Sequence, residues 1–204
     1  MNNRAPAGPI LTLKRKASLL KFRKSVNLTI NNLELLDIAL THSSYVNEKK
    51  MSLNRCNERM EFLGDSVLGL VVVNHLYRKY KQWQEDKLTQ MKSALVCEAA
   101  LARMGEGLKI GEYLLLGRGD SRLGGRHRPS TVSDAVEALI GAIFIDSGYA
   151  EAEKFILSRL GREMTDFNNK KGEQDFKSEL QNFCQRKHRF GPLYRVISAF
   201  GPEH

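Results

Sequence analysis

Residues 57–66 read Asn57-Glu58-Arg59-Met60-Glu61-Phe62-Leu63-Gly64-Asp65-Ser66 and lead into a long, mostly apolar segment. We predict a buried helix over residues 62–80, because this segment lacks the polar stripe of a surface helix. Each helical residue advances about 100°, so Glu58, Glu61 and Asp65, at spacing i, i+3 and i+7, share one face. Buried carboxylates are costly unless they are paired, hydrogen-bonded or bound to metal. The alternative is that these acids only meet the positive end of the helix dipole.

A second acidic pair, Asp134 and Glu137, opens another apolar helix that we expect over residues 134–145. The alternative interpretation is a capping box, in which an N-cap Asp and a Glu three residues later satisfy the first backbone N–H groups. If the two acidic helices pack side by side, four or five carboxylates converge and repel one another without cations. Hard oxygen ligands of this kind select Mg²⁺, which can activate water and neutralise charge in phosphodiester cleavage.

The net charge of +9 is concentrated at the two ends of the chain. Residues 1–24 hold seven Lys or Arg and no acid, residues 170–204 hold seven bases and four acids, and the middle is near neutral. Basic ends suit a polyanionic partner, because phosphates attract Lys and Arg and release counterions on binding. A solubility tail or a membrane-surface tail is the alternative, so charge alone does not decide for nucleic acid.

The three cysteines, Cys56, Cys97 and Cys184, show no close pairing, which argues against a disulfide framework and for a reducing compartment. No C-x-x-C or H-E-x-x-H motif offers zinc a site. The longest strongly apolar run, residues 68–73, is far too short to span a bilayer, and the basic N-terminus lacks the apolar region of a secretory signal. We therefore expect a cytoplasmic protein without membrane contact; an organellar transit peptide is the alternative for the acid-free start.

Helical patterning runs from residue 19 to about residue 165. Besides the two acidic helices, apolar spacing predicts helices over residues 33–40, 88–104 and 155–167. Residues 117–129, rich in Gly and Arg, read as a loop.

We divide the chain into a basic flexible arm (1–18), a helical domain (19–166), a linker (167–173) and a last segment (174–204). The last segment has a helical pattern followed by strand-like residues. About 30 residues of this kind cannot bury much core by themselves, so the segment reads as the first part of a domain.

Three motifs together resemble those of the bacterial ribonuclease III family. The run at residues 57–66 looks like the family signature, with Met60 where Leu is usual. Residues 134–142 are similar to its second acidic motif, and residues 39–45, Ala-Leu-Thr-His-Ser-Ser-Tyr, to its upstream motif. The spacings between the three motifs also fit, and the resemblance spans about residues 19–165.

The resemblance implies roles for particular acids. Glu61, Asp65, Asp134 and Glu137 match the residues that hold catalytic Mg²⁺, for which Mn²⁺ is expected to substitute. Asp65 and Glu137 are the expected catalytic residues, with Glu58 an acid at the cleavage site that places RNA or holds the geometry. Glu85 aligns less securely with an acid that lines the catalytic valley.

The resemblance also implies the fold, the assembly and the reaction. The fold would be the all-α ribonuclease III endonuclease domain, working as a homodimer in which Phe62 is an aromatic knob inserted into the partner; an ordinary core Phe is the alternative. Two sites along a valley would each cut one strand of double-stranded RNA, leaving staggered ends with 5′-phosphate and 3′-hydroxyl. Metal-activated water needs no covalent nucleophile. Processing of ribosomal RNA precursors, and of some mRNA and tRNA precursors, is the expected role, with no small-molecule substrate.

Two further segments resemble RNA-contacting parts of the family. The Gly- and Arg-rich loop could reach phosphates through Arg118, Arg122, Arg126 and Arg128, although a solvated basic loop is the alternative. Residues 174–204 resemble the opening α-β part of an α-β-β-β-α double-stranded RNA-binding domain, which reads A-form shape. Its expected RNA contacts are Ser178, Gln181 and His204, with Asn182 where Glu is common.

Two other function classes compete with a nuclease. A catalytically silent relative that binds RNA would keep the fold and lose acids, whereas all four metal-matching acids are present. A helical interaction protein unrelated to RNA would not need the joined motifs and the basic ends.

Overall fold

The computed structural model describes residues 11–170, 180–181, 183–185, 187, 189–193 and 195. The chain divides into two compact units between Thr165 and Asp166. The described part of the first unit is helical, and its single bridge, between Thr41 and Leu115, lies outside any strand. The predicted all-α character is therefore confirmed for these residues.

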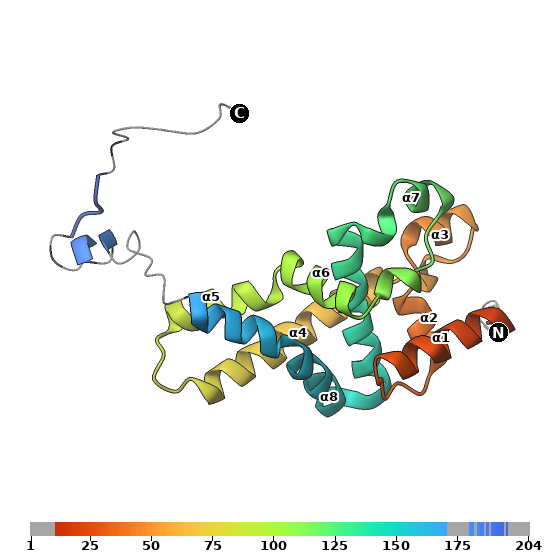
Figure 1. Cartoon of the computed structure of the whole chain (residues 1–204), viewed down its shortest axis with the longest axis horizontal. Helices are drawn as coiled ribbons and strands as arrows, with labels where there is room; N and C mark the ends of the chain where they lie inside the picture. Colours follow the sequence, from red (N-terminus) through yellow and green to blue (C-terminus); the bar gives the residue numbers. More distant parts are fainter. Residues whose placement is uncertain are drawn as a thin grey trace, which may run out of the picture. The chain divides into compact units, whose positions relative to one another are not determined.

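The helices follow one another with short connections (Figure 1). In chain order they are α1 (Leu13–Ser25), α2 (Leu33–Ala39), α3 (Ser43–Glu48), η1 (Leu53–Arg55), α4 (Glu58–Lys79), α5 (Glu85–Val96), α6 (Glu98–Gly107), η2 (Ile110–Glu112), α7 (Arg118–Arg122), η3 (Gly125–His127) and α8 (Pro129–Lys170), where η marks a 3-10 helix.

Helix α4 carries the first acidic run and packs against α5. One of its faces is fully buried at Leu68, Val71 and Val72. The opposite face exposes a second row of apolar side chains, consisting of Phe62, Leu70, Val73 and Tyr77. The predicted helix is therefore present but only half-buried.

Several helix boundaries differ from those that the sequence pattern predicts. The expected single helix over residues 88–104 is two helices, because Cys97 has an extended backbone (φ −73°, ψ 154°) between α5 and α6. The expected loop over residues 117–129 contains α7 and η3. Helix α8 begins at Pro129, five residues before Asp134, as suits a proline in a first helical turn.

Helix α8 changes direction once, at Gly148. That residue has φ 80° and ψ −177°, a conformation that favours glycine, so two helical segments meet there. The first segment carries the second acidic pair, and it is almost wholly buried from Ala135 to Ile143, apart from Glu137.

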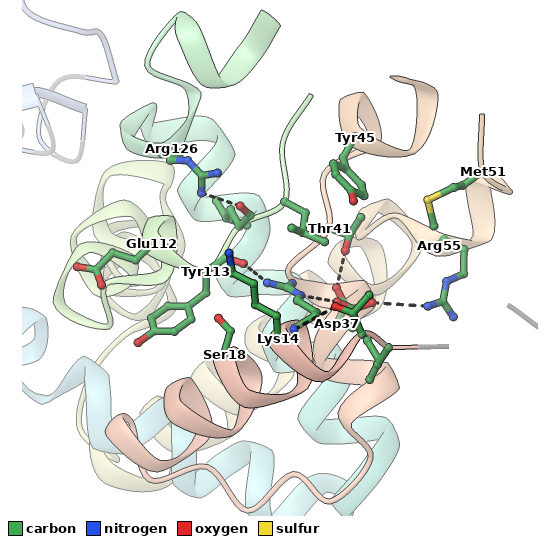
Figure 2. A pocket seen from close by; sticks show the side chains of 15 residues that line it. Lys14, Ser18, Asp37, Thr41, Tyr45, Met51, Arg55, Glu112, Tyr113 and Arg126 are labelled. Atoms are coloured by element: carbon green, nitrogen blue, oxygen red, sulfur yellow. Dashed lines mark hydrogen bonds and ion pairs between the residues drawn. The ribbon is translucent and has the colours of Figure 1, made fainter. Parts of the chain in front are cut away.

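A buried ion-pair network holds α1 to the rest of the fold. The Arg15 guanidinium donates to Asp37 Oδ1 at 2.7 Å and to the carbonyl oxygen of Tyr113 at 2.7 Å. Arg55 forms an ion pair with the other carboxylate oxygen of Asp37, with 3.6 Å between Nη2 and Oδ2. Asp37, Arg55 and Tyr113 line a cavity of about 670 Å³ (Figure 2). Because α1 begins at Leu13, the predicted flexible arm is wrong for residues 13–18.

The remaining boundaries fall largely outside the described residues. Helix α8 continues to Lys170, so the predicted linker begins inside a helix. In the second unit, residues 180–181, 183–185 and 187 are helical, and Leu193 and Arg195 are in no strand. Most of the predicted RNA-binding domain, including Ser178 and His204, lies outside the description, so that prediction stays a prediction.

Candidate active site

Helices α4 and α8 cross in direct backbone contact at two glycines. A Cβ on Gly64 would overlap the carbonyl oxygen of Glu137, and a Cβ on Gly141 would overlap the carbonyl oxygen of Met60. The same added Cβ on Gly141 would lie 3.3 Å from the backbone nitrogen of Gly64. Any side chain at either residue would push the helices apart. The crossing therefore brings the acids around Gly64 to those one turn before Gly141.

Five carboxylates gather at this crossing. Glu58, Glu61 and Asp65 come from the first turns of α4, and Asp134 and Glu137 come from α8. Glu58 and Asp65 are exposed, whereas Glu61, Asp134 and Glu137 are half-buried. The convergence that the sequence left conditional is present in the structure.

Electrostatic crowding is strongest at Glu137. Burial, followed by the charges of Asp65, Glu61 and Asp134, raises the pKa of Glu137 from 4.5 to about 7. Each of these groups therefore lies within electrostatic reach of Glu137.

Two neighbours share this crowding. Burial, followed by the charges of Asp134, Glu58 and Asp65, raises the pKa of Glu61. Burial also raises the pKa of Asp134, against a hydrogen bond from Ser133 that lowers it. The cluster is therefore poised to bind cations, which would relieve both the burial cost and the repulsion.

The sequence left two alternatives to a metal site, a capping box in α8 and a helix-dipole interaction in α4, and the structure rules out the first. Asp134 lies in the second turn of α8 and is not an N-cap, so the capping-box interpretation is wrong. Glu58 and Glu61 do lie in the first turn of α4, where the helix dipole favours acids. That contribution adds to their place in the cluster and does not exclude it.

The residue types at the crossing fit a hard divalent cation. Carboxylate oxygens are the ligands that Mg²⁺ takes, and it binds few of them while retaining waters. The acids are near enough to repel one another, but among the described residues no three His, Cys, Asp or Glu side chains have the arrangement that would hold a metal ion. The assignment of Glu61, Asp65, Asp134 and Glu137 as metal ligands stays a prediction that this donor chemistry supports.

Two residues that the sequence did not assign to the cluster act electrostatically on one of its acids, Asp134. His42, when protonated, lowers the pKa of Asp134, and the charge of Glu98 raises it. His42 lies in the upstream motif. Glu98 is the first residue of α6, a helix start that is hidden when residues 88–104 are read as one helix.

Glu85 is not brought to the cluster. It is an exposed first residue of α5, and its carboxylate accepts a hydrogen bond from Thr89 Oγ1 at 2.7 Å.

The arginines that were predicted to contact RNA differ in their solvent exposure and in the partners of their guanidinium groups. Arg126 is half-buried and donates to the carbonyl oxygens of Gly111 and Leu114, so it joins η3 to the segment around η2. Arg118, Arg122 and Arg128 are exposed. Arg118 pairs with Glu48 at 3.6 Å and Arg128 with Asp120 at 3.5 Å.

Phe62 is the most exposed apolar residue of α4, at 79%. A cavity of about 640 Å³ lies beside it and is bordered by Ile38, Met60 and Ile145. The alternative interpretation of Phe62 as an ordinary core residue is therefore wrong.

Comparison with known proteins now fixes the family. Residues 32–164 match the family model described as Ribonuclease-III-like. The chain belongs to the ribonuclease III family. It is accordingly an endoribonuclease, and its helical unit is the nuclease domain.

Similar proteins in the ribonuclease III family include curated bacterial enzymes and a solved nuclease domain. Ribonuclease 3 of Treponema denticola is 43% identical over 94% of this chain and 77% of its own length, and that of Borreliella burgdorferi is 38% identical over 94% and 78%. The nuclease domain of ribonuclease III from Campylobacter jejuni has a TM-score of 0.64 and 35% identity, covering 70% of this chain and 96% of that domain. No helix among the described residues has the length and apolarity needed to cross a membrane.

Proposed function

We propose that this chain hydrolyses phosphodiester bonds of double-stranded RNA with Mg²⁺ bound by Glu61, Asp65, Asp134 and Glu137. The observation that carries the proposal is the crossing of α4 and α8, which gathers these acids and raises the pKa of Glu137 to about 7. When bound, Mg²⁺ supplies activation of water and neutralisation of charge on the phosphate.

The chain's own residues position the ion and the substrate. Glu61, Asp134 and Glu137 are half-buried, so their side chains are held in place by packing, whereas Asp65 faces solvent. Glu58, one turn before Glu61, holds the geometry of the cleavage site. Hydrolysis adds water at phosphorus and breaks the bond to O3′, which leaves a 3′-hydroxyl and a 5′-phosphate.

We propose that the exposed arginines of the loop contact RNA phosphates. Arg122 has no hydrogen-bond or ion-pair partner among the described residues, and Arg118 and Arg128 pair only at the surface, where exchange for phosphate costs little. For Arg126 we propose a mainly structural role, because its Nη1 donates hydrogen bonds to two backbone carbonyl oxygens.

We propose a homodimer that forms through the exposed face of α4. The Phe62 ring and the adjacent cavity form a self-complementary pair, so a two-fold axis would place each Phe62 in the partner's cavity. Leu70, Val73 and Tyr77 extend the apolar row along the same helix. The Campylobacter jejuni nuclease domain likewise has a region involved in dimer formation. Two sites per dimer would cut the two strands at staggered positions.

The finer expectations complete the proposal. Residues 174–204 would contribute RNA contacts through Ser178, Gln181 and His204, and Glu85 would line the valley only in the assembled dimer. The natural targets would be precursors of ribosomal RNA and some mRNA and tRNA precursors. Three unpaired cysteines favour the cytoplasm.

The test is incubation of the purified chain with a long RNA duplex and with a single strand of the same composition, in Mg²⁺, in Mn²⁺ and in EDTA. We expect cleavage of the duplex alone, lost in EDTA, with products that carry 5′-phosphate and 3′-hydroxyl ends. Binding of the duplex without cleavage in either metal would favour a catalytically silent RNA-binding protein instead.

A further inference from the structure

His42 lies where the start of α4 meets the segment that leads into α7. Its own N–H donates to the carbonyl oxygen of Leu115 at 3.0 Å. The preceding residue, Thr41, accepts at its carbonyl from the N–H of Asn57 at 2.9 Å, directly before the acidic turn of α4. The backbone at His42 is thus fixed between the acidic cluster and the arginine loop of residues 117–128.

The hydrogen bonds around the ring determine which nitrogen carries the proton. The backbone N–H of Ser44 donates to Nδ1 of His42 at 3.2 Å, and Ser44 Oγ lies 2.8 Å from the same nitrogen. That hydroxyl accepts from the N–H of Gly117 at 2.9 Å, so its own hydrogen is free to point at Nδ1. Nδ1 is therefore an acceptor, and the neutral ring carries its hydrogen on Nε2.

The Nε2–H group has no acceptor among the contacts of the described residues. The side chain is 23% exposed, so the group can reach a ligand. The ring lies within electrostatic reach of the Asp134 carboxyl. Its Nδ1 is also 3.9 Å from Asp120, which pairs with Arg128 of the arginine loop.

We propose that His42 is a further substrate-binding residue, whose Nε2–H donates to a phosphate oxygen of the RNA strand held at the acidic cluster. The ring lies near Asp134 and near Asp120, the partner of Arg128, so a strand held by both the cluster and the loop would come close to it. A neutral donor suits that place, because it binds a phosphate oxygen without competing with a cation for the carboxylates. The inference rests on the proposed function and adds a contact to it.

A purely structural role is the competing explanation, because His42 also caps α3 and its Nδ1 interaction ties Ser44 to Gly117. Two substitutions separate the roles. Asn places its side-chain oxygen near the position of Nδ1 and is a favoured N-cap, but it has no group near Nε2. Gln places its amide nitrogen near the position of Nε2 and caps poorly.

The experiment measures duplex affinity in EDTA for His42→Asn and His42→Gln, each in a Glu137→Gln background, and kcat/KM with Mg²⁺ in the unaltered background. Melting temperatures of both variants are recorded beside these values. We expect His42→Asn to keep the melting temperature and lose about tenfold in affinity and in kcat/KM, the usual effect of one lost hydrogen bond to a charged group. We expect His42→Gln to retain most of both while melting lower.

The opposite pattern, with His42→Asn equal to the parent in binding and cleavage, would overturn the inference and leave a capping role. If the parent neither binds nor cuts the duplex, the proposed function fails. If the parent is active and the His42→Asn variant matches it, only the inference about His42 fails.

Discussion

The carbonyl oxygen of Glu137 occupies the place where a side chain on Gly64 would begin. This contact sets how closely α4 and α8 approach, and therefore how closely their carboxylates approach. A glycine that the family signature carries is thus part of the geometry of the active site, although it has no functional group.

We predict that Gly64→Ala lowers the free energy of unfolding by about 3 kcal/mol, the upper end of the range for overpacking, because the new methyl group meets backbone that cannot rotate away. Gly141→Ala should behave alike, since it faces the carbonyl oxygen of Met60. Chemical denaturation of both variants measures this.

The matched control is Gly161→Ala in α8, where a Cβ meets nothing within 4 Å. It should be neutral or stabilising by up to about 1 kcal/mol, as for an alanine in an open helical position. Equal stability of Gly64→Ala and Gly161→Ala would show that the helices do not cross as closely as described.

Glu137 gives the protein a pH dependence with a definite sign. Its pKa is about 7 when folded and 4.5 ordinarily, so the folded state takes up a proton between these values. The free energy of unfolding therefore falls as the pH rises through this window. Glu137→Gln removes the effect, and after allowance for solvent screening we expect it to be about 1–2 kcal/mol more stable than the parent at pH 8.

Thermal melts in EDTA at pH 5 and pH 8 test this prediction. The gain from Glu137→Gln should be larger at pH 8, and Glu106→Gln, which changes an exposed acid outside the cluster, should show no such difference. A gain that is larger at pH 5 would mean that Glu137 is not crowded by negative charge.

Substitutions of Arg122 and Arg126 should have different effects, the first on RNA binding and the second on stability. Arg122→Ala is expected to keep the melting temperature, weaken duplex binding and lower the salt-dependence slope by about one. Arg126→Ala should cost about 1.5–3 kcal/mol of stability, because it leaves two carbonyl oxygens without their donor. Binding titrations at several salt concentrations, beside thermal melts, distinguish the two; a reversal of the two effects would contradict the assignment.

Removal of the Phe62 ring should weaken the dimer. Phe62→Ala is expected to shift sedimentation toward the monomer at micromolar concentration, because the ring would no longer fill the cavity of the partner subunit. Leu123→Ala is the control, since Leu123 is similarly exposed at 77% but lies outside the α4 row. Unchanged sedimentation of Phe62→Ala, or an equal shift of both variants, would place the interface elsewhere.

The acidic cluster was the part of the site that the sequence predicted well. Helical spacing places Glu58, Glu61 and Asp65 on one face, and two acidic helix starts already suggest a shared site. The packing of α4 against α8 was not derivable from periodicity, because it depends on a contact between Gly64 and the backbone of Glu137, which leaves no pattern of apolar residues.

The errors have local physical causes. Cys97 breaks a helix without Gly or Pro, so residues 88–104 carry no signal of the break. The Gly-rich loop hides α7, a helix of five residues that depends on its contacts with Ser44 and Glu48. Arg126 resembles its neighbours in sequence, and only its hydrogen bonds to carbonyl oxygens suggest the structural role that we propose for it.

The most direct measurement of the central claim is the rate of duplex cleavage against Mg²⁺ concentration for the parent, Glu137→Gln and Glu106→Gln. If the carboxylates at the α4–α8 crossing form the metal-dependent site, Glu106→Gln should match the parent at every concentration. Glu137→Gln should then lose at least a hundredfold in rate while remaining folded and able to bind the duplex. A Glu137→Gln variant that cuts at the parental rate with the parental Mg²⁺ dependence would contradict the account.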